Sequence, residues 1–139
     1  MEKTLVLIKP DAFGKGHTGD ILKIYEAAGF KIVAAKVMQM DAKIAAIHYA
    51  EHVEKPFYPE LVEFMTSAPL MALVLGGENV IERVREINGA TNPAKAAEGT
   101  IRKLYAESVT KNAVHASDGA ETAAREIKIF FSEIEQFGA

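Results

Sequence analysis

The chain has 139 residues, of which 49% are hydrophobic and 25% are charged, and its formal net charge is −3. This length suits one globular domain, so we expect a single domain over residues 1–139. The negative net charge argues against a broad nucleic-acid surface, and the absence of cysteine excludes disulfides, thiolate metal sites and a cysteine nucleophile.

The first apolar run, Leu5 to Ile8, is closed by Lys9 and Pro10. Its strand-forming residues predict a short buried strand. The run is too short for a secretory signal, and no later segment approaches the ~20 apolar residues of a membrane span. We therefore expect a cytoplasmic protein that makes no membrane contact.

A helix is predicted next, over DILKIYEAAGF, because its apolar residues recur at helical spacing. Asp20 can cap the start of this helix and Gly29 suits its end. Residues 31–40 then predict a strand, and Asp41 is placed to cap a helix over residues 42–52.

The middle of the chain contains further patterns typical of helices and strands. Pro59 stands where a first helical turn would begin, before ELVEFM. Residues 69–77, PLMALVLGG, predict a buried strand that glycines end, and residues 79–87 predict a helix with Val80 and Val84 on its apolar face.

From Gly89 to Gly99 the apolar pattern stops, and the sequence GATNPAKAAEG predicts a long polar loop with one proline. Loops of this length in compact domains tend to be functional or mobile. A short helix around residues 101–107 and a minimal strand over AVHA are predicted to follow.

The last predicted helix begins after Asp118 and Glu121, which have the spacing of a capping box. Its predicted apolar stripe consists of Ala124, Ile127 and Phe131. Four strands with interspersed helices favour an α+β fold of βαββαβ type, with the helices on one face of the sheet and a long loop inserted.

A glycine motif near the start is misleading. Gly14, Gly16 and Gly19 spell G-x-G-x-x-G, the nominal fingerprint of a dinucleotide-binding site. In that fingerprint the first glycine turns the chain directly off the strand, whereas here KPDAF intervenes. We therefore interpret the stretch as a glycine-rich turn and discount an NAD-dependent enzyme.

Among the histidines, His48 and His52 have the i, i+4 spacing of a zinc pair, but the HExxH form is absent. We interpret them as residues of a solvated helix face. His115 differs, because small residues surround it and a carboxylate follows at Asp118. Two interpretations stay open from these residues alone: a nucleophile, or a histidine hydrogen-bonded in the core.

Several polar and basic residues could bind a polyphosphate if the fold brings them together, because such a ligand needs donors from separate segments. These are Lys9, Arg85, Thr91, Arg102 and Asn112.

Four stretches, in the same order and spacing over essentially the whole chain, resemble the nucleoside diphosphate kinase family. They are IKPDAF, HYAEHVEKPFYPELVEFM, GATNPAKAAEGTIR and NAVHASD. The resemblance implies a ferredoxin-like sandwich that transfers the γ-phosphate of a nucleoside triphosphate, typically ATP, to a nucleoside diphosphate through a phosphohistidine.

The resemblance also implies a role for each matching residue. His115 matches the nucleophile, Glu126 the carboxylate that orients its ring, and Ser117 the hydroxyl that supports the carboxylate. Other residues match those that contact the nucleotide. Lys9 and Tyr49 match the residues at the transferred group, and Arg85, Thr91 and Arg102 match those at the other phosphates. Asn112 matches the residue at the ribose, and Phe57 and Val109 match those at the base.

Asp118 resembles the residue that holds Mg²⁺ through water, the ion being bound mostly by the phosphates. Stacking on an aromatic ring reads no base edge, so broad base specificity is expected. The resemblance further implies a homo-oligomer, a tetramer or a hexamer.

One departure from the family pattern is Ala116, where the family usually has glycine. The alternative from another class is a catalytically silent module that binds nucleotides or proteins as a regulator.

Overall fold

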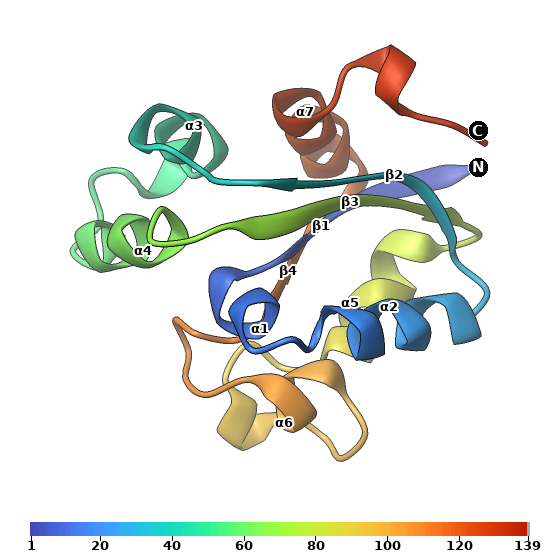
Figure 1. Cartoon of the computed structure of the whole chain (residues 1–139), viewed down its shortest axis with the longest axis horizontal. Helices are drawn as coiled ribbons and strands as arrows, with labels where there is room; N and C mark the ends of the chain where they lie inside the picture. The colour runs from blue at the N-terminus through green and yellow to red at the C-terminus, as the bar shows by residue number, and fades with distance from the viewer. Residues whose placement is uncertain (139) are drawn as a thin grey trace.

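The computed structural model describes residues 1–138 and contains one four-stranded sheet (Figure 1). The strands are β1 (Glu2–Ile8), β2 (Lys31–Met38), β3 (Leu70–Gly77) and β4 (Val114–Ala116). They lie in the order β2-β3-β1-β4, and every neighbouring pair is antiparallel. This confirms the ferredoxin-like βαββαβ sheet expected from the sequence.

Helices and single helical turns connect the strands. The α-helices are α1 (Pro10–Gly14), α2 (Thr18–Ala27), α3 (Ala42–His48), α4 (Tyr58–Met65), α5 (Val80–Asn88), α6 (Ile101–Tyr105) and α7 (Ala120–Phe130). The 3-10 turns are η1 (Ala50–His52), η2 (Pro93–Lys95) and η3 (Glu133–Glu135). No helix within residues 1–138 is long and apolar enough to cross a membrane.

Helices cover both faces of the sheet, so the prediction that they lie on one face was wrong. Val6 and Ile8 of β1 pack in a core with α2 and α5, whereas Leu5 and Leu7 pack on the opposite face in a core with α3, α4 and α7. In Figure 1, α2 and α5 lie below the sheet and α3 and α7 above it. A strand covered on both sides reads as a continuous apolar run, and LVLI has this form.

Several predicted helix boundaries needed correction. Asp20 lies inside the first turn of α2, whose N-cap is His17, and a short helix, α1, begins at Pro10. α7 begins after Gly119 without a side-chain cap, so the Asp118–Glu121 capping box is absent. Of the predicted apolar stripe, Ile127 and Phe131 are buried, but Ala124 is exposed and Ala123 is buried in its place. The two capping errors arose because backbone geometry at a turn determines which residue becomes the cap.

Other local predictions were confirmed. Asp41 accepts a hydrogen bond from the backbone N–H of Ile44 at 2.8 Å and caps α3. Gly29 has φ of +91° just after α2, a conformation that favours glycine. Gly14 lies within α1 and Gly19 within α2, so the glycine motif does not join a strand to a helix as a dinucleotide site requires.

The predicted long loop lies between α5 and α6 and contains the single turn η2. Asn92 accepts a hydrogen bond from the N–H of Ala94 at 3.0 Å, which closes the turn that Pro93 begins. At the start of the loop Gly89 has φ of +88°, and a Cβ there would lie 2.6 Å from Oγ1 of Thr100. The loop therefore leaves α5 through a position where a side chain would collide with the start of α6.

Candidate active site

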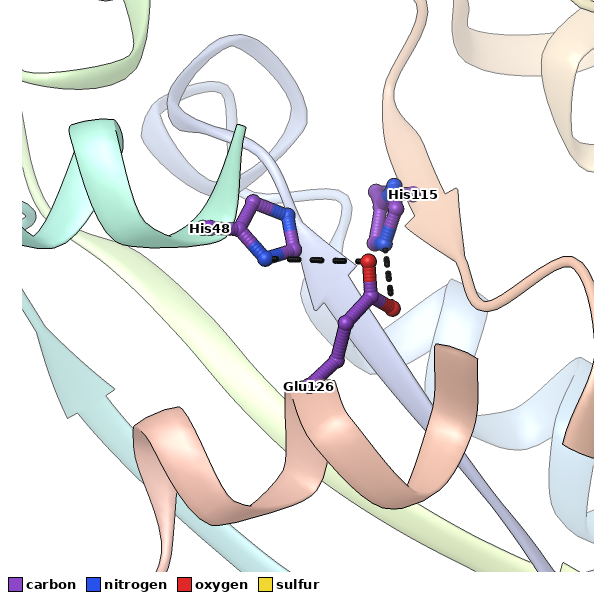
Figure 2. Close-up of side chains that lie close together, drawn as sticks. All are labelled: His48, His115 and Glu126. Carbon is purple, nitrogen blue, oxygen red and sulfur yellow. Dashed lines mark hydrogen bonds and ion pairs between the residues drawn. The ribbon is translucent and has the colours of Figure 1, made fainter. Parts of the chain in front are cut away.

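His115 lies on the edge strand β4, opposite Leu7 of β1, and its side chain is 22% exposed. Its Nε2 lies 3.1 Å from Oε1 of Glu126 on α7 (Figure 2). Sheet and helix thus hold the two side chains in contact across 11 positions of the sequence. The other ring nitrogen, Nδ1, points away from Glu126.

Ser117 supports the same carboxylate oxygen. Its hydroxyl donates to Oε1 of Glu126 at 2.7 Å and accepts from the N–H of Leu5 at 3.3 Å. Burial by itself raises the pKa of Glu126, but the hydrogen bond and charge of His115, followed by the bond from Ser117, lower it overall. Glu126 is therefore ionised at neutral pH, and a nitrogen that faces an ionised carboxylate must donate its proton. This places the His115 proton on Nε2 and leaves a lone pair on Nδ1.

A cavity of about 1110 Å³ opens in front of His115. Many of the predicted site residues line it: Lys9, Arg85, Thr91, Arg102, Asn112, His115 and Asp118. They come from β1, α5, the long loop, α6 and β4 and from the segments beside these elements. The fold therefore gathers the donors that the sequence places far apart.

Lys9 is buried at the end of β1, and its Nζ donates to Oδ1 of Asn112 at 2.8 Å. Asn112 in turn donates from Nδ2 to the carbonyl of Thr91 at 3.2 Å. The pKa of Lys9 is lowered to about 8, mainly by burial and also by the charge of Arg102, while Asp11 opposes both effects. Lys9 is consequently a cation at neutral pH that an anionic ligand would stabilise.

Arg102 is positioned by two backbone carbonyls. Its Nη1 donates to Gly89 and its Nη2 to Val114, both at 2.8 Å. Its Nε is buried and has no hydrogen-bond partner within residues 1–138. Burial lowers the pKa of Arg102, Tyr25 opposes this, and Arg85 adds to it. The guanidinium thus stays charged beside the start of the long loop and next to β4.

The backbone that leads into β4 is strained at Ala113, whose φ is +74°. The N–H of Val114 bonds to the carbonyl of Asn112 at 2.9 Å, which makes a tight γ-turn around Ala113. The carbonyl of Ala113 accepts from the N–H of Lys9 and its N–H donates to Asp11. These bonds hold the strained residue between Lys9 and His115.

Ala116 is compatible with its backbone. Among residues 1–138, Asn79 and Ala113 are the non-glycine residues with positive φ, so Ala116 does not need the left-handed freedom of glycine.

The remaining predicted residues lie outside the cavity lining. Tyr49 is buried, and its hydroxyl has no hydrogen-bond partner within the described residues. Burial, and then Glu126, raise the pKa of Tyr49. Phe57 is 49% exposed and Val109 is 56% exposed. Both present apolar surface to solvent, as a stacking platform for a base would require.

His48 was assigned wrongly from the sequence. It is buried, whereas His52 is partly exposed and its Nδ1 lies 2.9 Å from Nζ of Lys55, so the two histidines share neither a solvated face nor a zinc site. Nδ1 of His48 lies 3.7 Å from Oε2 of Glu126, and the His48 and His115 rings meet edge to face at 4.8 Å. A signal was present, because Ala45, three residues earlier in α3, predicts the same buried face.

Two groups could hold a metal ion. The ligand atoms of His48, His115 and Glu126 lie within 4.8 Å of one another. Two imidazoles suit zinc better than Mg²⁺, which prefers oxygen. The exposed carboxylate of Asp118 lines the cavity and supplies the oxygen that Mg²⁺ prefers.

Comparisons with known proteins agree on one family. The family model described as nucleoside diphosphate kinase matches residues 2–136. A nucleoside diphosphate kinase of Chlamydia felis is 53% identical over 135 residues, covering 97% of this chain and 96% of the relative. The solved nucleoside diphosphate kinase of Aquifex aeolicus has a TM-score of 0.95 at 45% identity, covering 98% of this chain and 99% of that one. The solved nucleoside diphosphate kinase of Halobacterium salinarum, in complex with CDP, has a TM-score of 0.95 at 42% identity, covering 99% of this chain and 92% of that one.

Proposed function

Since the chain belongs to the nucleoside diphosphate kinase family, it is a phosphotransferase that moves phosphate from a nucleoside triphosphate to a nucleoside diphosphate, and we propose that His115 carries the phosphoryl group. The observation that supports this role is the 3.1 Å contact between Nε2 of His115 and Glu126, because it leaves the Nδ1 lone pair free. The alternative of a silent regulatory module finds no support among the relatives.

The proposed reaction has two steps. First the Nδ1 lone pair forms a bond to the γ-phosphorus, the bond from that phosphorus to the bridging oxygen breaks, and the nucleoside diphosphate leaves with the electron pair. Then a terminal phosphate oxygen of the acceptor attacks the phosphohistidine, and the electron pair of the P–N bond returns to Nδ1. Throughout, Nε2–H donates to Glu126, which stabilises the positive charge that develops on the ring.

Transfer of this kind needs alignment and charge neutralisation more than further covalent chemistry. In the proposed assignment Lys9 and Tyr49 contact the transferred group, Arg85, Thr91 and Arg102 bind the other phosphates, and Asn112 binds the ribose. Lys9, Arg102 and Asn112 support this assignment, because they are already held by the hydrogen bonds described above. The base would stack on Phe57, with Val109 beside it.

We further propose that Mg²⁺ is the cofactor, that the protein is a homo-oligomer, and that it acts in the cytoplasm. Asp118 would hold Mg²⁺ through water. The ion, bound mostly by the nucleotide phosphates, would neutralise their charge.

Substitution of the proposed nucleophile tests the function. The protein is mixed with ATP labelled on its γ-phosphate and Mg²⁺, free nucleotide is removed, and acid-labile label on the protein is measured. The wild type should carry label and pass it to GDP, and the His115→Ala variant should lose both the label and turnover. Retained transfer from ATP to GDP in this variant would contradict the assignment.

A further inference from the structure

His48 is an unusual residue to bury in this core. Its side chain is fully buried, and neither ring nitrogen has a hydrogen-bond partner within residues 1–138. Burial, and then the neighbouring His115, lower its pKa to about 3, so the ring is neutral at physiological pH. A buried polar group without a partner costs stability, and an apolar side chain of similar size would avoid that cost. The position of His48 therefore needs an explanation other than packing.

The neighbours of His48 suggest what it does. The Glu126 carboxylate lies between two imidazoles, with Oε1 facing Nε2 of His115 and Oε2 facing Nδ1 of His48 (Figure 2). Oε1 also accepts from Ser117, whereas the 3.7 Å between Oε2 and His48 is longer than a hydrogen bond. The contact with His48 is thus electrostatic, and it tightens if the carboxylate moves toward α3.

The His48 ring also restricts the nucleophile itself. It meets the His115 ring edge to face at 81°, and it is enclosed by the rings of Tyr49 at 4.5 Å and Phe130 at 5.3 Å. Because these aromatic neighbours hold His48, the His48 ring forms a fixed wall on one side of His115 and Glu126. A neutral ring suits this position, since a charged His48 would compete with His115 for the carboxylate.

We propose that His48 is a positioning residue, which holds the Glu126 carboxylate and through it the His115 ring in the orientation that phosphoryl transfer needs. This inference rests on the proposed role of His115. A proton on Nδ1 of His48 would direct an N–H dipole at Oε2 and so favour the carboxylate orientation that leaves Oε1 for His115. Misalignment of a reacting group by a fraction of an ångström lowers its rate while substrate binding is retained.

A double-mutant cycle tests the inference. The His48→Phe substitution keeps an aromatic ring among Tyr49 and Phe130 but removes both nitrogens. We expect the single-turnover rate constant for phosphorylation by ATP to fall on the order of 10- to 100-fold, with ATP affinity changed less than about twofold. In a Glu126→Gln background the same substitution should cause no further loss, because His48 acts through that carboxylate. His17→Phe, the same change at a histidine outside the cavity lining, should leave the rate constant unchanged.

Two outcomes of the cycle overturn the inference. An equal loss with and without Glu126 would mean that His48 only supports the fold, and no loss in either background would mean that it has no role in transfer. If His48→Phe does not fold, the same cycle is run with His48→Leu, another apolar side chain that lacks both ring nitrogens. The loss should again appear with Glu126 and vanish in the Glu126→Gln background, and an equal loss or no loss in both backgrounds overturns the inference. His48→Gln, whose amide can still donate to Glu126, should retain at least about a third of the wild-type rate constant.

A measurement on the native protein gives an independent answer. Nitrogen NMR of the histidine rings at neutral pH should show His48 neutral with its proton on Nδ1. A proton on Nε2 would aim a lone pair at the carboxylate and overturn the inference without any substitution. The result also separates the two proposals, because label on wild-type His115 supports the proposed function whatever the state of His48.

Discussion

Lys9 and Asn112 form a buried hydrogen bond in which Nζ lies 2.8 Å from Oδ1, although 103 positions of sequence separate them. The bond joins the residue after β1 to the segment that leads into β4 and His115. It leaves Lys9 buried in the cavity wall beside Arg102, with a proton held less tightly than in an exposed lysine. The protonation of Lys9 should therefore control how the free enzyme captures a nucleotide.

We predict that kcat/KM for ATP falls as pH rises through about 8, the pKa of Lys9. Above this pH the free enzyme loses the cation that we propose contacts the transferred group, and kcat/KM reports groups of the free enzyme. Bound phosphate raises the lysine pKa again, so kcat should fall only at higher pH. The measurement is a pH profile of steady-state rates between pH 6 and 10 (an assay range of roughly four units).

The Lys9→Gln variant is the control for this profile. It should be slower at every pH and should lack the inflection near pH 8, and an inflection that persists would contradict the assignment to Lys9.

The pH dependence of folding stability has the opposite sign to that of kcat/KM, because stability rises with pH over this range. Lys9 binds its proton up to about pH 8 when folded and up to its ordinary 10.5 when unfolded. Its buried charge therefore lowers the free energy of unfolding below pH 8, and this penalty is relieved between about 8 and 10.5.

We predict that Phe57 recognises every base in the same way. Its ring is half-exposed, lies 5.5 Å from the His52 ring and has Nζ of Lys55 at 5.9 Å, so it offers a π-face and no base-specific hydrogen bond. ADP, GDP, CDP, UDP and TDP should all be accepted. Loss of ~1–3 kcal/mol of stacking in Phe57→Ala should raise KM for all five by a similar factor, about 5- to 150-fold.

Steady-state rates with the five diphosphates check this prediction, and Val53→Ala is the matched control. Val53 is another exposed apolar residue of the segment between α3 and α4, and its truncation should leave all five KM values unchanged. Strict use of one base by the wild type, or a Phe57→Ala effect confined to one base, would refute the stacking role.

We predict that Pro93 stabilises the oligomer through the long loop. The loop has one helical turn, which Pro93 begins by fixing φ, and ordering so polar a segment on an isolated subunit is costly. Pro93→Ser should lower the thermal midpoint by about 2–8 °C and lower turnover at room temperature less. Thermal unfolding and activity of the variant are compared with those of Pro69→Ser, the same change at an exposed proline before β3.

Light scattering at micromolar concentration checks assembly directly, and the wild type should have the mass of a tetramer or a hexamer. A monomeric mass would contradict the proposed oligomer. A midpoint that falls equally in Pro93→Ser and Pro69→Ser would assign the effect to the proline alone and not to assembly.

Local patterns predicted the fold well where one segment carries the whole signal. The apolar run Leu5–Ile8, the cap at Asp41 and the glycine at Gly29 all depend on contacts within a few residues, and the structure confirms each. The errors occurred where the outcome depends on packing. The continuous apolar run LVLI does indicate a strand covered on both faces, but which helices pack on each face is decided by tertiary contacts and could not be read from β1 itself.

For the site, the sequence by itself determined which residue types are available: one histidine among small neighbours, a carboxylate on the last helix, and cations in separate segments. Only the tertiary structure decided which of them meet. Lys9 reaches Asn112, and Glu126 reaches both His115 and His48, because the sheet order places β1 beside β4 and α7 packs against α3. The tertiary structure also decided which side chains are buried. Burial in turn lowers the pKa of Lys9 and keeps His48 neutral. Chain-local periodicity encodes helices and strands, but desolvation and the contacts between distant side chains exist only once those elements are packed.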